Sequence, residues 1–381
     1  MSPFLSPQEA AEAAVAVYGV RLSDDVDTAF RRTILRNNFS LGGREAKISG
    51  QSGILRSDSG FGVIAAGTGA RSNEVVIVTR GTVTSADWYN NALANTTLST
   101  TGKSVHSGFN KIFLSLQNEL ELKLKLMSPS SIHCVGHSLG GALANLVAEW
   151  VLANKLAEKE NVYTFGSPRV GMRRFAEDLT NSAGVLNIHR VYHKTDIVPM
   201  VPVWPYVHSP EPGMSCFIDS PGNYPGGEYH DKELYLSSVK SYNKWEKLKR
   251  HPPKTNLEQQ VEDWMDSDSP LSLTTNTIAL ISSAIIYAIK KISLAGLQFV
   301  VGEAVNVIDV LAQFFAKAVH VSKDILGMIG NLMKRILQAL GVASVKVGNV
   351  TYDFVKWVLD TLSSALYKTV SAAVRFVHNG L

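Results

Sequence analysis

Residues Ile132-His-Cys-Val-Gly-His-Ser-Leu-Gly-Gly141 form a short apolar run that breaks at a glycine, presents Ser138 and leads into the apolar segment 142–156. This order predicts a strand, a sharp turn and a helix. Glycines stand two residues on either side of Ser138, where such a turn leaves no room for a Cβ. We therefore expect Ser138 to be a nucleophile lifted above the strand, with the backbone N–H of Leu139 able to donate to an oxyanion.

Length and composition allow a large core and two domains, because the chain has 381 residues of which 45% are apolar. The net charge of +4 is uneven: from Asn276 onward ten basic and five acidic residues give +5, which leaves −1 for the first 275 residues. The basic residues of this C-terminal third stand singly among apolar ones, which suits an anionic membrane surface better than nucleic acid. We therefore expect no nucleic-acid partner.

The cysteines and the N-terminal residues give information about the cellular location of the protein. Cys134 and Cys216 do not make a disulfide framework, and we expect free thiols. Residues 1–9 lack the basic and apolar regions of a Sec signal. The expectation is a cytoplasmic location in the producing cell, or export by a route without such a signal, or association with a membrane.

Helical and extended patterns alternate through the first two thirds of the chain. Helices are expected over residues 8–18, 26–35 and 110–127, and strands over 48–55, 60–66, 73–82, 161–171 and 188–199. The run at 73–82 shows no polar alternation, which indicates a strand buried on both faces. Alternating strands and helices predict an α/β sheet whose chemistry lies in the loops at strand ends.

Five separated segments, in the same order, resemble the class 3 lipases, the α/β-hydrolase family of the fungal triacylglycerol lipases and many bacterial and plant phospholipases and esterases. The segments are Arg80-Gly-Thr82 with Asp87-Trp88 and Asn91, His106-Ser-Gly-Phe109, Gly136-His-Ser-Leu-Gly-Gly141, Thr164-Phe-Gly-Ser-Pro-Arg-Val-Gly171, and Asp196-Ile-Val-Pro199. The resemblance covers about residues 75–236 and does not reach the C-terminal third. It implies an α/β-hydrolase domain that hydrolyses carboxylic esters of lipids.

The resemblance also implies partners for Ser138. Family members carry the triad aspartate at Asp-x-Val-Pro, here Asp196, where it would orient the base. The chain order Ser, Asp, His leaves five candidates for that base: His208, His230, His251, His320 and His378. We prefer His230, because the family's catalytic histidine likewise precedes a helix with an aromatic residue a few positions on. His208 resembles a histidine that the family often has near its substrate cleft, and we interpret it as structural.

Thr82 occupies the family's oxyanion position and would complete the oxyanion hole with the N–H of Leu139. This chemistry needs no metal or organic cofactor. The segment after the oxyanion residue is a lid in this family, and residues 85–95 carry three lid candidates: Trp88, Tyr89 and Leu93. Because this segment is only half apolar, we expect a preference for esters with polar head groups, such as phospholipids or partial glycerides, over neat fat.

Domain organisation is indicated by a change in composition near His251-Pro-Pro-Lys254. We expect an α/β-hydrolase domain over 1–250, a linker with a short acidic helix over 251–275 and an amphipathic, mostly α-helical domain over 276–381. Residues 271–289 carry no charge; they are long enough to just span a bilayer core, but their Ser and Thr content suits a buried core helix as well.

Two further apolar stripes at helical spacing run over 305–340 and 354–377. Such helices form a packed bundle or dock on the hydrolase, or they lie in a membrane interface. The sequence therefore predicts a lipid-hydrolysing serine esterase, a phospholipase A or an acylglycerol lipase. Two alternatives stay open: a membrane-perturbing or pore-forming effector in which the C-terminal helices act, and an esterase for non-lipid esters.

Overall fold

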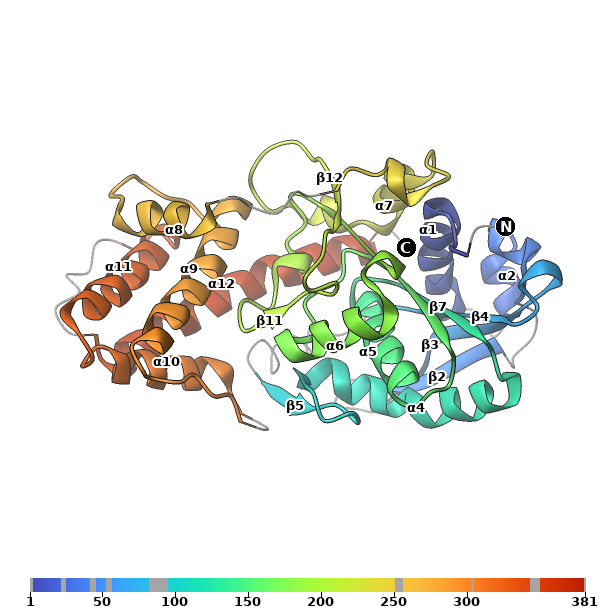
Figure 1. Ribbon diagram of the computed structural model, residues 1–381. Helices are drawn as coiled ribbons and strands as arrows, with labels where there is room; N and C mark the ends of the chain where they lie inside the picture. Colours follow the sequence, from blue (N-terminus) through green and yellow to red (C-terminus); the bar gives the residue numbers. More distant parts are fainter. Residues whose placement is uncertain are drawn as a thin grey trace.

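The structure, a computed structural model, describes residues 3–21, 25–41, 46–52, 57–81, 95–250, 256–302, 305–342 and 350–379. Its main sheet consists of β1 (Phe39–Ser40), β2 (Lys47–Ser52), β3 (Ser57–Gly67), β4 (Glu74–Thr79), β7 (Ser131–His137), β8 (Lys159–Phe165), β10 (Ile188–His193) and β12 (Cys216–Ile218). These eight strands lie in the order β1-β3-β4-β7-β8-β10-β12, with β2 paired to β3 (Figure 1). The pairs from β4 to β12 are parallel, whereas β1, β2 and β4 are antiparallel to β3.

Parallel neighbours need crossover connections, and α-helices supply those between β4 and β7, β7 and β8, and β8 and β10. They are α4 (Ser107–Met127), α5 (Leu139–Ala153) and α6 (Arg173–Ala183). Alternate residues of β4 belong to two different core clusters: Val75 and Ile77 pack with α4, α5 and α6, while Val76 and Val78 pack with α1 (Pro7–Ala16) and α7 (Lys232–Val239). The sheet is therefore covered on both faces, as the unbroken apolar strand predicted.

The predicted helix over 26–35 is wrong in its second half. Helix α2 (Val26–Phe30) ends early, and a short 3-10 helix, η2 (Ile34–Asn37), follows. Between them Thr33 takes an extended conformation (φ −87°, ψ 145°), and its hydroxyl donates to the carbonyl of Phe30 at 2.9 Å. A threonine side chain that bonds a carbonyl of the preceding turn competes with helix continuation, which explains the break.

A smaller sheet flanks the main one. It has four strands in the order β11 (Tyr206–Val207), β9 (Gly171–Met172), β6 (Ser104–His106) and β5 (Thr96–Leu98). It joins the segment that precedes α4 to the loops that follow β8 and β10. The small sheet therefore fixes the start of α4 relative to the loops beyond the main sheet.

The C-terminal third is helical, as predicted. It contains α8 (Leu257–Asp266), α9 (Thr275–Leu294), α10 (Val307–Ala318), α11 (Lys323–Ala339) and α12 (Tyr352–Asn379). The single stripe over 305–340 is two helices, because Ser322 accepts from the N–H of Ile325 at 3.2 Å and begins a new helix. The α/β-hydrolase class with a mostly helical C-terminal region is thus confirmed.

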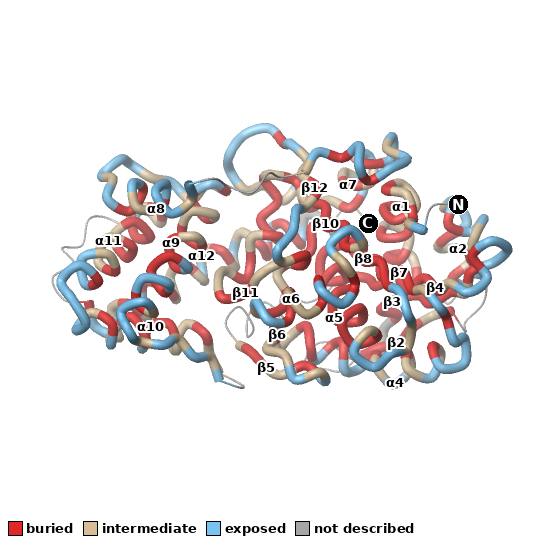
Figure 2. The backbone as a smooth tube through the Cα atoms, viewed as in Figure 1, coloured by how far each residue is buried: buried red, intermediate tan, exposed pale blue. Residues whose placement is uncertain are grey.

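The apolar faces of these helices are packed inside the protein. Residues of α9 to α12 share one core cluster with α4, α5 and α6, including Leu311, Ile329 and Leu362. Figure 1 shows α8 to α11 together at one end, with α12 running from them towards the sheet, and Figure 2 shows buried stretches on all of them. Since one cluster includes residues from both sides of the predicted domain boundary, the division at 251–275 stays a prediction.

Helices α12 and α9 have further contacts within the protein. Helix α12 packs against η7 (Gly227–His230) of the hydrolase part. By length and composition alone, α9 is long and apolar enough to cross a bilayer, with a mean hydropathy of 1.5, and half of that window (50%) is buried inside the protein. In the packed arrangement α9 lies against α8 and α11.

Candidate active site

The turn between β7 and α5 has the strained geometry that the flanking glycines predicted. Ser138 has φ 59° and ψ −129°, a backbone conformation that costs energy for any residue with a side chain. A Cβ on Gly136 would lie 2.2 Å from the carbonyl of Gly140, and a Cβ on Gly140 would lie 2.2 Å from the carbonyl oxygen of Thr79. Both positions therefore require glycine, and the turn holds the serine at the carboxyl end of the strand.

Ser138, His230 and Asp196 come together at this turn. His230 Nε2 lies 2.8 Å from Ser138 Oγ, and His230 Nδ1 lies 2.8 Å from Asp196 Oδ2. Ser138 is 6% exposed, His230 is 1% exposed and Asp196 is fully buried. Because the carboxylate accepts the Nδ1 proton, Nε2 carries the lone pair that could take the serine proton. The arrangement can therefore generate a serine nucleophile.

The Asp196 carboxylate accepts two further hydrogen bonds. The N–H of Val198 donates to Oδ1 at 2.9 Å, and the hydroxyl of Tyr235 donates to Oδ2 at 2.7 Å. Burial, with Asp196 beside it, raises the pKa of Tyr235 well above its usual value, so this phenol remains a donor. A buried carboxylate is costly unless it is hydrogen-bonded, and these donors offset that cost. The role of Tyr235 was not predicted from the sequence. Its position in the helix that follows His230, five residues after that histidine, could have indicated that it contacts the triad.

A second set of contacts, which the sequence analysis did not predict, holds the backbone of His230. His137 Nε2 lies 2.9 Å from the carbonyl oxygen of His230, and His137 Nδ1 lies 2.9 Å from the hydroxyl of Tyr18. A carbonyl only accepts, so Nε2 donates to it and Nδ1 accepts from Tyr18. The two imidazole rings lie 4.7 Å apart, and Gly81 lies against the same Tyr18 hydroxyl, since a Cβ on Gly81 would be 2.5 Å from it. Tyr18 thus lies between Gly81, the residue before Thr82, and the loop of His230.

The oxyanion and lid predictions fall largely outside the described residues. Thr82 and the three lid candidates, Trp88, Tyr89 and Leu93, lie in the segment 82–94, which is not described. Leu139 is the first residue of α5, where a backbone N–H has no acceptor within the helix. Its N–H is therefore available to an oxyanion at Ser138.

His208 has a different environment from His230. Its Nε2 lies 2.9 Å from the guanidinium of Arg190 and 2.7 Å from the carbonyl oxygen of Pro199. Burial, and then the charges of Arg190 and Arg169, lower the pKa of His208 well below its usual value. His208 is therefore held neutral by contacts away from the nucleophile, which is compatible with a structural role, and His230 is the histidine that faces Ser138.

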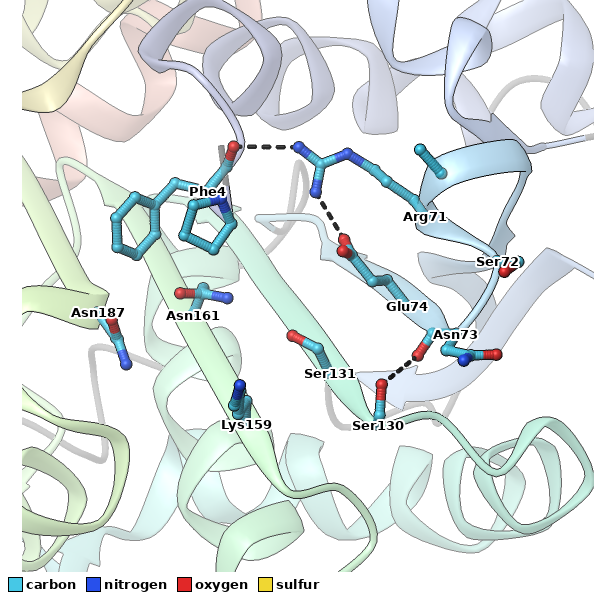
Figure 3. Close-up of a pocket in the computed structure, with 12 residues that line it drawn as sticks. Phe4, Arg71, Ser72, Asn73, Glu74, Ser130, Ser131, Lys159, Asn161 and Asn187 are labelled. Atoms are coloured by element: carbon cyan, nitrogen blue, oxygen red, sulfur yellow. Dashed lines mark hydrogen bonds and ion pairs between the residues drawn. The ribbon is translucent and has the colours of Figure 1, made fainter. Parts of the chain in front are cut away.

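Other candidate sites are few in the described part of the chain. No group of three or more His, Cys, Asp or Glu side chains there could hold a metal ion. Cys134 and Cys216 are free and buried, as expected. A hollow of about 430 Å³ lies beside Phe4, Arg71 and Glu74 (Figure 3). It borders the amino ends of β4, β7 and β8, at the opposite end of the sheet from Ser138, so it does not belong to this site.

Comparisons of the sequence with known proteins find similarity to lipases. A family model described as Lipase (class 3) matches residues 76–206, about a third of the chain. The chain is 30% identical over 195 residues to a secreted mono- and diacylglycerol lipase of Fusarium solani, across 49% of this chain and 54% of that protein. It is 36% identical over 104 residues to toxin TseL of Vibrio cholerae, across 27% of this chain and 16% of the toxin. The resemblance to class 3 lipases that the sequence predicted is confirmed for this part of the chain.

Further similarities cover parts of other lipases. Phospholipase A1-II 1 of Oryza sativa is 33% identical over 117 residues, 29% of each chain. The chain thus spans about half the length of the Fusarium relative and less of the other two. Among solved structures, a lipase of Yarrowia lipolytica aligns with a TM-score of 0.45 and 23% identity over 61% of this chain and 82% of that one. A lipase of Rhizopus microsporus aligns with a TM-score of 0.41 and 24% identity over 55% and 72%.

Proposed function

We propose that this protein is a serine hydrolase that cleaves carboxylic ester bonds of lipids. The observation that carries the proposal is the unbroken line of hydrogen bonds from Asp196 through His230 to Ser138, each 2.8 Å long, at a strained strand-to-helix turn. Sequence similarity to enzymes named as lipases and phospholipases supports the same reaction class.

The proposed reaction has two stages. In acylation, His230 takes the Ser138 hydroxyl proton as the oxygen attacks the ester carbonyl, and it then gives that proton to the departing alcohol. In deacylation, His230 takes a proton from water, the hydroxide attacks the acyl-enzyme, and the proton returns to Ser138 as the fatty acid leaves. Asp196 holds the imidazole in the required tautomer and stabilises its charged form. No metal or organic cofactor enters these steps.

The tetrahedral intermediates require donors for their oxyanion. We assign this role to the backbone N–H of Leu139, at the start of α5, and to Thr82. The packing of Gly81 against Tyr18, whose hydroxyl contacts His137, supports this assignment, because it brings the residue before Thr82 near the loop of His230. Loss of one oxyanion donor typically lowers the rate by about 10²- to 10³-fold.

For the substrate we propose lipids with polar head groups, either phospholipids or partial glycerides. The Fusarium and Oryza relatives act, by their names, on mono- and diacylglycerols and as a phospholipase A1. The half-polar composition of residues 85–95 favours the same class over neat triacylglycerol.

Product analysis by mass spectrometry tests the proposal. Mixed phospholipid vesicles, partial glycerides and triacylglycerol emulsions are incubated with the wild type, with Ser138→Ala and with Ser237→Ala, whose hydroxyl lies on the exposed side of α7. We expect free fatty acid and the matching lysolipid or glycerol product from the wild type and Ser237→Ala only. Equal product from Ser138→Ala would contradict the assignment of the nucleophile, and the absence of any lipid product would contradict the substrate class.

The alternative of a membrane-perturbing protein with a secondary hydrolase part is not favoured. The Fusarium and Oryza relatives, whose names state an activity, are ester hydrolases. The apolar faces of α10, α11 and α12, which such a mechanism would use, lie in the core cluster. An enzyme whose substrate is a lipid is nevertheless expected to contact a membrane surface.

A further inference from the structure

The loop between α9 and α10 combines exposure with a lack of charge. Residues 292–302 contain no charged side chain. Leu294, the last residue of α9, is 76% exposed, and Val300 in the loop is 73% exposed. Single exposed apolar residues are normal on a protein surface, but an uncharged run with two large exposed side chains is a candidate contact surface. We refer to residues 294–300 as the apolar loop.

The end of α4 shows why exposure alone does not distinguish this loop. Leu122 and Leu126 are 67% and 87% exposed. They are interspersed with charged residues that form ion pairs along the helix, Lys123 with Glu119 at 3.3 Å and Lys125 with Glu121 at 2.6 Å. Entry of that helix into a lipid surface would strip water from these charges, whereas the apolar loop has none to desolvate.

The apolar loop and the chain after it are attached to the hydrolase part at two places. The ring of Phe299 lies 4.9 Å from that of Trp204, which belongs to the same loop as Asp196, and 5.1 Å from Phe314 of α10. Farther along, the carbonyl of Val305 accepts from the N–H of Thr96 at 3.1 Å, directly after the segment 82–94. Figure 1 shows the chain between α9 and α10 reaching down next to β5. One attachment thus lies on the loop that carries Asp196, and the other directly follows, in sequence, the segment that begins with Thr82.

The remaining apolar surface of the C-terminal region is mostly used in packing. The stripes of α10, α11 and α12 contribute to the core cluster, so binding a membrane through them would require them to leave it. The apolar loop is exposed without any such rearrangement. Residues 276–381 also carry a net charge of +5, ten basic minus five acidic, which favours an anionic lipid surface.

We propose that the apolar loop inserts Leu294 and Val300 into the surface of an anionic lipid bilayer and so holds the hydrolase part at the surface that contains its substrate. This inference deepens the proposed function and rests on it for the nature of the substrate. Phe299 would keep its contact with Trp204 during insertion, so that the loop and the segment carrying Asp196 approach the surface together.

The test measures vesicle binding in a protein that cannot hydrolyse the lipid. In the Ser138→Ala background, Leu294→Glu with Val300→Glu is compared with Leu122→Glu with Leu126→Glu, which places the same charges at similarly exposed positions of α4. Binding is measured by co-sedimentation with vesicles of phosphatidylcholine mixed with phosphatidylglycerol, and far-UV circular dichroism and urea unfolding verify that each variant is folded. Burial of one such side chain accounts for about a tenfold change in affinity, so we expect the loop variant to bind at least about tenfold more weakly.

Each outcome decides the proposal. Weaker binding of the loop variant with retained binding of the α4 variant supports it. Unchanged binding of the loop variant, equal losses in both variants, or no binding of the parent protein overturns it. If the parent binds through the loop while the enzyme with Ser138 releases no product from lipids, the proposed function fails and the membrane contact stands.

A second measurement does not depend on introduced charges. Cys134 and Cys216 are buried, so a thiol added by Leu294→Cys can be labelled with an environment-sensitive fluorophore. We expect its emission to shift to shorter wavelength when the same vesicles are added, and a label on Leu126→Cys to show no shift. The absence of a shift at position 294 would overturn the proposal.

Discussion

Replacement of Tyr235 by phenylalanine removes one hydroxyl group and tests how the triad is supported. This hydroxyl donates to Asp196 Oδ2 at 2.7 Å and accepts from the backbone N–H of His193 at 3.1 Å. The side chain is 1% exposed, so water does not readily replace either partner. The variant therefore leaves a buried carboxylate with one donor fewer and a backbone N–H without its acceptor.

The magnitude is set by these two bonds. A hydrogen bond to a charged group contributes about 1.5–3 kcal/mol, and an unsatisfied buried N–H costs about 1–3 kcal/mol. We expect the free energy of unfolding to fall by about 2–4 kcal/mol, since the two losses share one site and add incompletely. The Tyr235–Asp196 hydrogen bond also helps to hold the carboxylate in line with His230. If the transition state loses about 1.4 kcal/mol, close to the lower end of this bond's contribution, kcat decreases about tenfold.

The assay is steady-state hydrolysis of a soluble short-chain ester, together with urea unfolding. Because Tyr235 contacts the triad and not the substrate, we expect kcat to fall and KM to stay unchanged. Tyr229→Phe is the matched control, since Tyr229 lies in η7, just before α7, and its hydroxyl forms only an exposed contact of 3.4 Å with the carbonyl of Pro221. A Tyr235→Phe enzyme with the kcat and stability of the Tyr229→Phe enzyme would refute this account of the carboxylate.

Two further predictions concern the turn and the buried histidines. Gly140→Ala should destabilise the protein by about 3 kcal/mol and abolish hydrolysis, because its Cβ would lie 2.2 Å from the carbonyl oxygen of Thr79. The control is Gly327→Ala, on open surface of α11, which should stabilise the protein by about 0.5–1 kcal/mol. The urea unfolding midpoints of both variants test these values. Burial lowers the pKa of His189 to about 3 and that of His193 to about 4. The unfolded chain therefore binds more protons below its histidine pKa of about 6.5, and stability that is complete above this value is lost as the pH falls towards 4; at pH 5 each histidine accounts for about 2 kcal/mol. Urea unfolding at pH 7.5 and pH 5 checks this: equal stability at both pH values would contradict the sign, and His189→Phe should reduce the loss.

Much of the hydrolase fold could be predicted because its signals are local. The apolar run before Ser138, its flanking glycines and the helix after it predicted β7, the turn and α5 within a few residues. Helix α12 was likewise predicted from its periodicity. The failures were also local: the helix over 26–35 broke where Thr33 bonds back to Phe30, and the stripe over 305–340 was two helices because Ser322 begins a new one. In both cases the apolar spacing was helical, but a hydrogen bond of a side-chain hydroxyl interrupted the helix.

By itself, the sequence determined which segments become strands, which become helices and where the nucleophile turn lies, because periodicity and glycine requirements depend on neighbouring residues. The tertiary structure alone decided which side chains meet. The parallel register of β7 with β8 and of β8 with β10 brings the ends of three strands to one edge, and only there do Ser138 and His230, 92 residues apart, come within 2.8 Å. The same holds for Tyr18, which contacts His137 across 119 residues, and for the C-terminal stripes, whose periodicity was compatible with both a core and a membrane. Periodicity states that a helix has an apolar face, and packing decides what covers that face.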